Sequence, residues 1–192
     1  MIWQYADKAD DQARDLADRH YSREKPGTRL FTPPGRNLVL KTFGAYWVTY
    51  WPYKEFSIHR WAGMWECSAF RREAPCEYLA SDLIMQAVAA TRWYKLYGAQ
   101  SWRYSQEPRV YSKIARCDAS FVTFVDPTKI RKKRDPGRCF LRAGFVPDGE
   151  TEKRHYLAFV LPCDNMPEPE PPLREHALNL YARQQLALLR KA

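Results

Sequence analysis

The stretch from residue 65 to 162 constrains the fold of this chain more than any other part of the sequence. Short runs rich in apolar and β-branched residues, bounded by turn residues, alternate in it with segments of helical periodicity. The expected elements, in order, are a strand at Trp65–Arg72, a helix at Ala80–Tyr94, a strand at Phe121–Val125, a short helix at Gly137–Ala143 and a strand at Tyr156–Leu161. This order predicts an α/β (α+β) fold in which a mixed sheet is flanked by helices on both faces.

The elements outside this stretch extend the same sheet. Residues 8 to 19 read as a helix, and two further strands are expected at Asn37–Thr42 and Ala45–Trp51. The first helix has one apolar face, formed by Ala13, Leu16, Ala17 and His20. The helix at Ala80–Tyr94 has the clearest stripe, with Ser81 or Asp82 able to cap its start and with apolar positions at Leu83, Ile84, Ala87, Val88 and Thr91.

The domain organisation follows from composition along the chain. We expect residues 1–161 to form one domain, residues 162–172 a Pro-rich extended linker, and residues 173–192 a C-terminal helix. That helix packs either on the domain or on a second copy, so a homodimer is one possible state.

The charge and cysteine content restrict the partners and the compartment. The chain has 31 Lys and Arg against 22 Asp and Glu, a net charge of +9, which suits a polyanion such as double-stranded DNA. The five cysteines are odd in number and form no CxxC pair, so neither a disulfide framework nor a metal site is expected. No apolar run is long enough for a membrane span, and we expect a cytoplasmic protein.

Several strings resemble known acyltransferases. The sequence PGRCFLRAGF followed by HYLAFVLP resembles the C-terminal half of the GNAT acyltransferase fold. The strings RHYSREKPG, CSAFRRE and TFVDPTKIR, at 19–27, 67–73 and 123–131, look like phage DNA-modification acyltransferases related to the Mom protein of bacteriophage Mu. This resemblance implies transfer of a carbamoylmethyl group to the exocyclic amine of adenine in DNA, which shields phage DNA from restriction.

The sequence departs from ordinary GNAT members in two places. The loop from Arg71 to Ser81 holds no glycine where the family binds the coenzyme A pyrophosphate, so we expect coenzyme A to bind weakly. Many members carry a Tyr that acts as a general acid four residues before the Gly of the Gly-Phe pair, and in this sequence that position is Phe140. An anionic donor could instead lie at the helix start, with Arg71, Arg72 and Ser81 as the candidate donor-binding residues. The donor itself stays open between a glycine-derived molecule and an acyl coenzyme A.

Three residues are the catalytic candidates. His20 and Tyr21 follow the first helix, where the resemblance places acceptor-binding groups; His20 could accept a proton, and Tyr21 could stack on a base or donate a hydrogen bond. Asp126 ends a buried strand and could orient His20 or bind the acceptor amine. The structural alternatives are a His that caps its own helix and a turn Asp that bonds its own backbone.

A basic run follows the buried strand directly. It predicts contacts to DNA phosphates, with a solvated loop as the structural alternative. The candidate DNA-binding residues are Arg23, Lys129, Arg131, Lys132, Lys133 and Arg134.

These observations predict a DNA base-modifying transferase of the Mom type. Because adenine's amine is conjugated and must leave the base stack to be reached, Tyr21, Trp47 and Trp61 are potential stacking platforms, although core packing is the simpler reading of each Trp. The alternatives are an acyltransferase acting on an amine-bearing hypermodified thymine, an acetyl coenzyme A-dependent acetyltransferase of proteins or small amines, and a DNA-binding module without catalysis.

Overall fold

The computed structural model describes residues 1–52, 59–74, 76–97, 120–130 and 135–173. A seven-stranded mixed sheet has the order β1-β2-β3-β4-β5-β7-β6, and every neighbouring pair is antiparallel except β4 and β5, which are parallel. The strands are β1 (Gln4–Ala6), β2 (Arg36–Thr42), β3 (Ala45–Trp51), β4 (Trp65–Arg72), β5 (Phe121–Val125), β6 (Val146–Glu150) and β7 (Leu157–Leu161). The helices are α1 (Asp11–Asp18), α2 (Ala80–Tyr97) and α4 (Arg138–Arg142), with 3-10 turns at η2 (Pro127–Lys129) and η3 (Cys163–Asn165).

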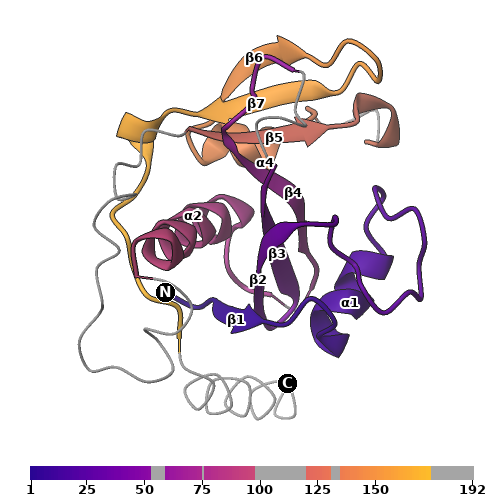
Figure 1. Cartoon of the computed structure of the whole chain (residues 1–192), viewed down its shortest axis with the longest axis vertical. Helices are drawn as coiled ribbons and strands as arrows, with labels where there is room; N and C mark the ends of the chain where they lie inside the picture. Colours follow the sequence, from indigo (N-terminus) through magenta and orange to yellow (C-terminus); the bar gives the residue numbers. More distant parts are fainter. Residues whose placement is uncertain (53–58, 75, 98–119, 131–134, 174–192) are drawn as a thin grey trace.

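Helices cover both faces of the sheet, which confirms the predicted architecture (Figure 1). On one face α1 buries Ala13, Leu16 and Ala17 against a small cluster that includes Tyr46 and Val48. On the other face α2 and α4 pack over the main core, where each predicted apolar position of α2 is buried. Trp47 and Trp61 are core residues, at 0% and 3% exposure, so neither is available as a stacking platform.

A chain of buried hydrogen bonds fixes α2 against the sheet. The Trp47 indole donates to Thr49 Oγ1 at 2.7 Å, and the hydroxyl oxygens of Thr49 and Thr91 lie 2.9 Å apart. Thr91 Oγ1 in turn donates to the Ala87 carbonyl at 2.8 Å. Each polar side chain in this series of hydrogen bonds has a partner. The series therefore sets the depth at which α2 lies on β3 without leaving any of these atoms unsatisfied.

The two parallel strands separate soon after they meet. Pairing between β4 and β5 covers only Trp65 with Phe121, Glu66 with Val122, and Cys67 with Thr123. At the next residue, Ser68, the register of β4 against β3 shifts, because Val48 faces Ala69 while Thr49 faces Cys67. Such a bulge bends a strand and increases its twist. Figure 1 shows the result, with β2–β4 running at a steep angle to β5–β7.

Several sequence expectations need correction at the boundaries. The Asp10 side chain accepts from the Ala13 amide at 3.0 Å and starts α1 at residue 11, so the helix is shorter than 8–19. The helix α2 begins at Ala80, which places Ser81 and Asp82 inside its first turn rather than at the cap. The strands β1 and β6 were not expected as separate elements; both are edge strands whose short sequences have little period-two patterning.

The Pro-rich segment is docked on the domain instead of spanning free space. The Leu173 amide donates to the Trp3 carbonyl at 2.7 Å, and the Glu170 carboxylate pairs with the N-terminal amine at 3.2 Å. Met166 is buried in the main core. The predicted linker is therefore an extended strap, and the predicted C-terminal helix lies almost entirely outside the described residues.

Candidate functional site

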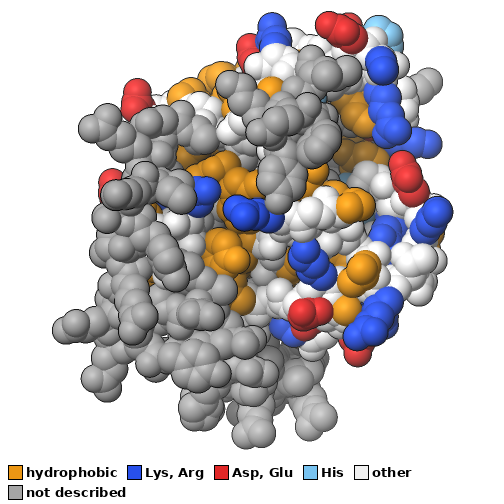
Figure 2. All heavy atoms as spheres, in the orientation of Figure 1, with side chains coloured by type: hydrophobic (Ala, Val, Ile, Leu, Met, Phe, Trp, Pro, Cys, Tyr) orange, Lys and Arg blue, Asp and Glu red, His pale blue; other side chains and the backbone are white. Residues whose placement is uncertain are grey.

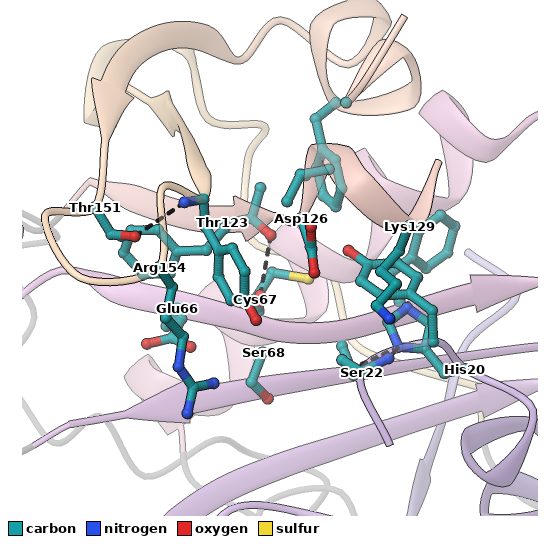
Figure 3. A pocket seen from close by; sticks show the side chains of 18 of the residues that line it. His20, Ser22, Glu66, Cys67, Ser68, Thr123, Asp126, Lys129, Thr151 and Arg154 are labelled. Atoms are coloured by element: carbon teal, nitrogen blue, oxygen red, sulfur yellow. Dashed lines mark hydrogen bonds between the residues drawn. The ribbon is translucent and has the colours of Figure 1, made fainter. Parts of the chain in front are cut away.

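A cavity of about 670 Å³ opens where β4 and β5 separate. Its walls come from the segment after α1, from β4, from β5 with the turn that follows it, from the start of α4 and from the β6–β7 connection. This volume is in the range of pockets that hold a small molecule or a nucleotide base. Figure 3 shows side chains of several of these elements pointing into the same space.

His20 lies at this cavity but has both of its polar ends engaged. Its Nδ1 lies 2.7 Å from Ser22 Oγ and 3.3 Å from the Ser22 amide, and its ring also hydrogen-bonds the Phe70 backbone carbonyl of β4. Burial, helped by the nearby Arg71 guanidinium, lowers the pKa of His20 to about 4. His20 is therefore neutral at pH 7, and accepting a substrate proton would require it to break one of these bonds.

Tyr21 reaches across the opening to the other strand. The Asp126 backbone amide donates to the Tyr21 hydroxyl, and burial of the hydroxyl raises its pKa. The ring stacks on His20, with centroids 4.5 Å apart and planes 30° apart, while 42% of the residue remains exposed. Two adjacent residues therefore bond to different strands: His20 to β4 and Tyr21 to the end of β5.

Asp126 caps the 3-10 turn η2 with one of its carboxylate oxygens. Oδ1 accepts from the Thr128 hydroxyl at 2.6 Å and from the Thr128 amide at 2.9 Å, as the turn-Asp alternative expected. These bonds, the hydroxyl first, lower the pKa of Asp126, so the side chain is a carboxylate at neutral pH. No hydrogen bond joins its carboxylate to His20 among these contacts, so Asp126 does not orient His20; Oδ2 remains able to accept from a ligand.

Glu66 is a site residue that the sequence reasoning missed. It comes from β4 on the face opposite α2, and its side chain makes no hydrogen bond or ion pair with any described residue. Burial raises the pKa of its carboxyl group to about 7. A single acidic residue inside the otherwise apolar strand WECSAF was the available signal, because a carboxyl in a buried strand is rare without a partner or a function.

Two more polar atoms in the cavity have no partner among the residues that the structure describes. They are Ser68 Oγ, at the bulge of β4, and His59 Nδ1, just before β4. The His59 ring packs edge-on against Phe124 at 5.7 Å between centroids, which fixes the imidazole on the cavity wall. Buried donors and acceptors are normally paired, so these atoms mark a place where a ligand or water completes the bonding.

The cavity rim is basic. Lys129, Lys153 and Arg154 are exposed and line it, and the Arg154 guanidinium lies 5.9 Å from the Tyr156 ring centroid. Figure 2 shows Lys and Arg side chains along the α1 side of the molecule up to the β6–β7 end. Sequence reasoning named Lys129 but missed the other two, because they are separate from the conspicuous basic run in the sequence.

The remaining DNA-binding candidates divide into two groups. Arg23 lines the cavity, but its guanidinium pairs with Asp18 at 2.9 Å and donates to the Thr28 and Leu30 carbonyls, so it holds the loop after α1 together. The other candidates lie outside the described residues, namely Arg131, Lys132, Lys133 and Arg134.

The three predicted donor-binding residues do not come together at the cavity. Arg71 donates to Glu73 and to the Arg19 carbonyl on the α1 face. Arg72 donates to the Tyr78 carbonyl at 2.6 Å and to the Cys76 carbonyl, so it holds the β4–α2 loop. Ser81 Oγ is 3.4 Å from the Asp82 carboxylate, and none of the three lines the cavity. Anion binding by this set would require the two arginines to exchange protein partners for the donor.

The two thiols on the cavity wall are poor nucleophiles. Burial raises the pKa of Cys67 and also that of Cys139, so both remain protonated at neutral pH. Within the described ranges, no three His, Cys, Asp or Glu side chains are grouped so that they could hold a metal ion. The site therefore offers neutral and acidic oxygen groups, an engaged imidazole and a basic rim.

Neither a membrane-spanning helix nor a known relative indicates what this protein does. In the described part of the chain, no helix combines the length and the apolar character that a membrane crossing requires. Comparison of the chain with protein-family models, with curated proteins and with solved structures gives no match. Its function must therefore be inferred from the cavity and from the residues that line it.

Proposed function

We propose that this protein is a transferase that modifies an amine of a base in DNA, of the Mom type, with the exocyclic amine of adenine as the target. The observation that carries the proposal is the cavity at the separation of β4 and β5, which combines the carboxyl groups of Glu66 and Asp126 with a basic rim. The sequence resemblance supports the same activity, because its three strings supply the His20–Tyr21 pair, much of β4 and Asp126.

Asp126 is the group best suited to the acceptor amine. Its Oδ1 is held by Thr128, which fixes the carboxylate while Oδ2 stays available. A carboxylate that accepts a hydrogen bond from the amine increases electron density on nitrogen, which the conjugated amine of adenine lacks. Asp126 thus has the charge state and the fixed position that this role requires.

The transfer step can be balanced with these groups. The amine nitrogen forms a bond to the electrophilic carbon of the donor, and the bond between that carbon and its leaving group breaks with its electron pair going to the leaving group. The attacking nitrogen becomes cationic and strongly acidic, so even a carboxylate of low basicity can take its proton. Asp126 Oδ2 receives that proton in this scheme, and His20 is a positioning residue because its nitrogens bond to Ser22 and Phe70.

The basic rim provides the contact to DNA. Exposed Lys129, Lys153 and Arg154 can neutralise phosphates next to the cavity opening, and such contacts position a duplex without reading its sequence. The amine of a stacked base is out of reach of a group inside a cavity, so the target base must be turned out of the helix.

The direct test is nucleoside mass spectrometry of DNA from cells that express the protein. Wild type is expected to give an adenine adduct, and Asp126→Asn, which keeps the size of the side chain, is expected to lower its yield by roughly two to four orders of magnitude. The matched control is Asp7→Asn, an exposed carboxylate outside the cavity lining. An adduct found only on amine-bearing thymine would replace adenine as the target, and no adduct with retained DNA binding would refute transferase activity.

A further inference from the structure

Three polar groups of the cavity form a set that the transfer step does not use. Glu66 and Ser68 come from β4, and His59 comes from the segment just before that strand. Figure 3 shows the Glu66 and Ser68 side chains extending from the same strand into the space below Thr123. Asp126, by contrast, comes from the end of β5.

This set has bonding capacity and no partner within the described residues. Ser68 Oγ and His59 Nδ1 are each buried and unpaired, and Glu66 bonds to no described side chain. A buried polar atom without a partner is unfavourable, so Ser68 Oγ and His59 Nδ1 favour a ligand that pairs with them, and the Glu66 carboxyl group lines the same cavity. The cavity also has flat apolar walls, including Phe124 and Tyr156, which suit a planar ring.

We infer that Glu66 reads the edge of the acceptor base, pairing with an amino group and with the unprotonated ring nitrogen beside it. Adenine and cytosine present this edge, whereas guanine and thymine present a ring N–H at the corresponding position. The inference rests on the proposed function and deepens it, because it names the class of base that the cavity accepts. The second N–H of the amino group is then left for Asp126.

The protonation state of Glu66 determines which edge it fits. A neutral carboxyl group has one O–H donor and one C=O acceptor, which match a ring nitrogen and an amino N–H. Burial is the only cause that raises the pKa of Glu66, to about 7, so at lower pH the group is neutral. A carboxylate only accepts, so it fits the two adjacent N–H groups of guanine instead.

Other titratable groups face the same cavity and must be considered in any pH dependence. Burial lowers the pKa of His20 to about 4 and raises the pKa values of the Cys67 and Cys139 thiols. All three groups are therefore uncharged at neutral pH. The remaining titratable or charged groups of the lining are Tyr21, Arg23, Glu24, His59, Asp126, Lys129, Lys153, Arg154 and Tyr156. His59 belongs to the same set of polar groups as Glu66, so a His59→Asn variant separates its contribution from that of Glu66.

The test is a binding measurement with defined probes. Short oligonucleotides of abasic units carrying one central adenine, cytosine, guanine or thymine are titrated with the full-length protein at about pH 6 and about pH 8.5. At the lower pH, wild type is expected to bind adenine or cytosine about tenfold or more tightly than guanine or thymine, which is the usual effect of a bidentate pair. At the higher pH, this preference is expected to disappear or to shift towards guanine.

Two substitutions of Glu66 test the proposed pairing. Glu66→Gln keeps one donor and one acceptor whatever the pH, so it is expected to prefer adenine or cytosine at both pH values. Glu66→Leu is expected to bind all four probes equally. Equal affinity of wild type for the four bases, or the same pH-dependent change in Glu66→Gln as in wild type, would overturn the inference.

The outcome is distinguishable from failure of the proposed function. If the protein modifies DNA but binds the four probes equally, only the role inferred for Glu66 is wrong. If the protein shows the base preference but forms no adduct, the role of Glu66 stands and the transferase proposal is wrong. If Glu66→Leu does not fold, Glu66→Gln still decides the question, because its pH profile is the measured quantity.

Discussion

Replacing Glu66 with Gln is expected to change how the stability of the protein depends on pH. The carboxyl group titrates near 4.5 in the unfolded chain and at about 7 in the folded protein, because burial disfavours its charged form. The stabilising effect of the raised pKa is fully present below 4.5 and is lost as pH rises towards 7. A difference of that size corresponds to about 3 kcal/mol in the free energy of unfolding.

Urea unfolding of wild type and Glu66→Gln between about pH 4 and pH 8 measures this quantity. Relative to wild type, the variant is expected to gain about 3 kcal/mol over the interval. Only the difference is informative, because His20, whose pKa is lowered to about 4, destabilises both proteins as the pH falls.

Glu73→Gln is the matched control for the same experiment. Hydrogen bonding to Arg19 and Arg71 lowers the pKa of Glu73 to about 2, so this carboxylate stabilises the fold above its unfolded pKa of 4.5 and loses that effect at lower pH. Its variant should therefore show a pH trend opposite to that of Glu66→Gln. Parallel stability profiles for wild type and Glu66→Gln would refute the claim that Glu66 is buried and uncharged below pH 7.

Three further predictions concern DNA binding, the His20–Tyr21 pair that joins β4 to the end of β5, and binding of the donor. Changing Lys129, Lys153 and Arg154 together to Ala should weaken binding to all DNA sequences and reduce the slope of log affinity against log salt by about 2 to 3, as measured by fluorescence anisotropy; an unchanged slope would remove the rim from the interface. Tyr21→Phe, which loses the contact between the Tyr21 hydroxyl and the Asp126 amide, should lower the modification rate at least as much as it lowers base affinity; full activity would show that this contact is not needed. Acetyl coenzyme A should bind weakly in calorimetry, because Arg72 and the glycine-free loop are bonded to each other; tight binding would favour ordinary acetyl transfer.

Much of the fold could be predicted because its elements have strong local patterns. The stripe of α2, from Leu83 to Thr91, and the apolar run of β5 each depend on residues close in sequence. Edge strand β1 was missed because three residues give too little periodicity, and edge strand β6 because Pro147, Asp148 and Gly149 indicate a turn; the pairing of both is set by the neighbouring strand. Docking of the Pro-rich strap also depends on distant partners, as in the bond from Leu173 to Trp3.

The site was predictable only in part, for a related reason. His20, Tyr21 and Asp126 were found through short strings, and the structure places all three at one cavity. Their bonding could not be read from the sequence, because it depends on how far β4 and β5 separate. Glu66 carries no motif, and its importance comes from burial without a partner.

The His20–Tyr21 pair has a geometric consequence that neither residue has alone. Because the two residues are adjacent, the bond from His20 to the Phe70 carbonyl and the bond from Asp126 to Tyr21 limit how far β4 and β5 can separate at the cavity. Glu66 lies on the first of these strands and Asp126 at the end of the second. The bridge therefore helps to fix the distance between the two carboxyl groups, one proposed to read the base and the other to hold its amine. In the proposed transferase, His20 would therefore act by holding the two strands at a fixed separation, and its nitrogens would not need to exchange a proton with the substrate.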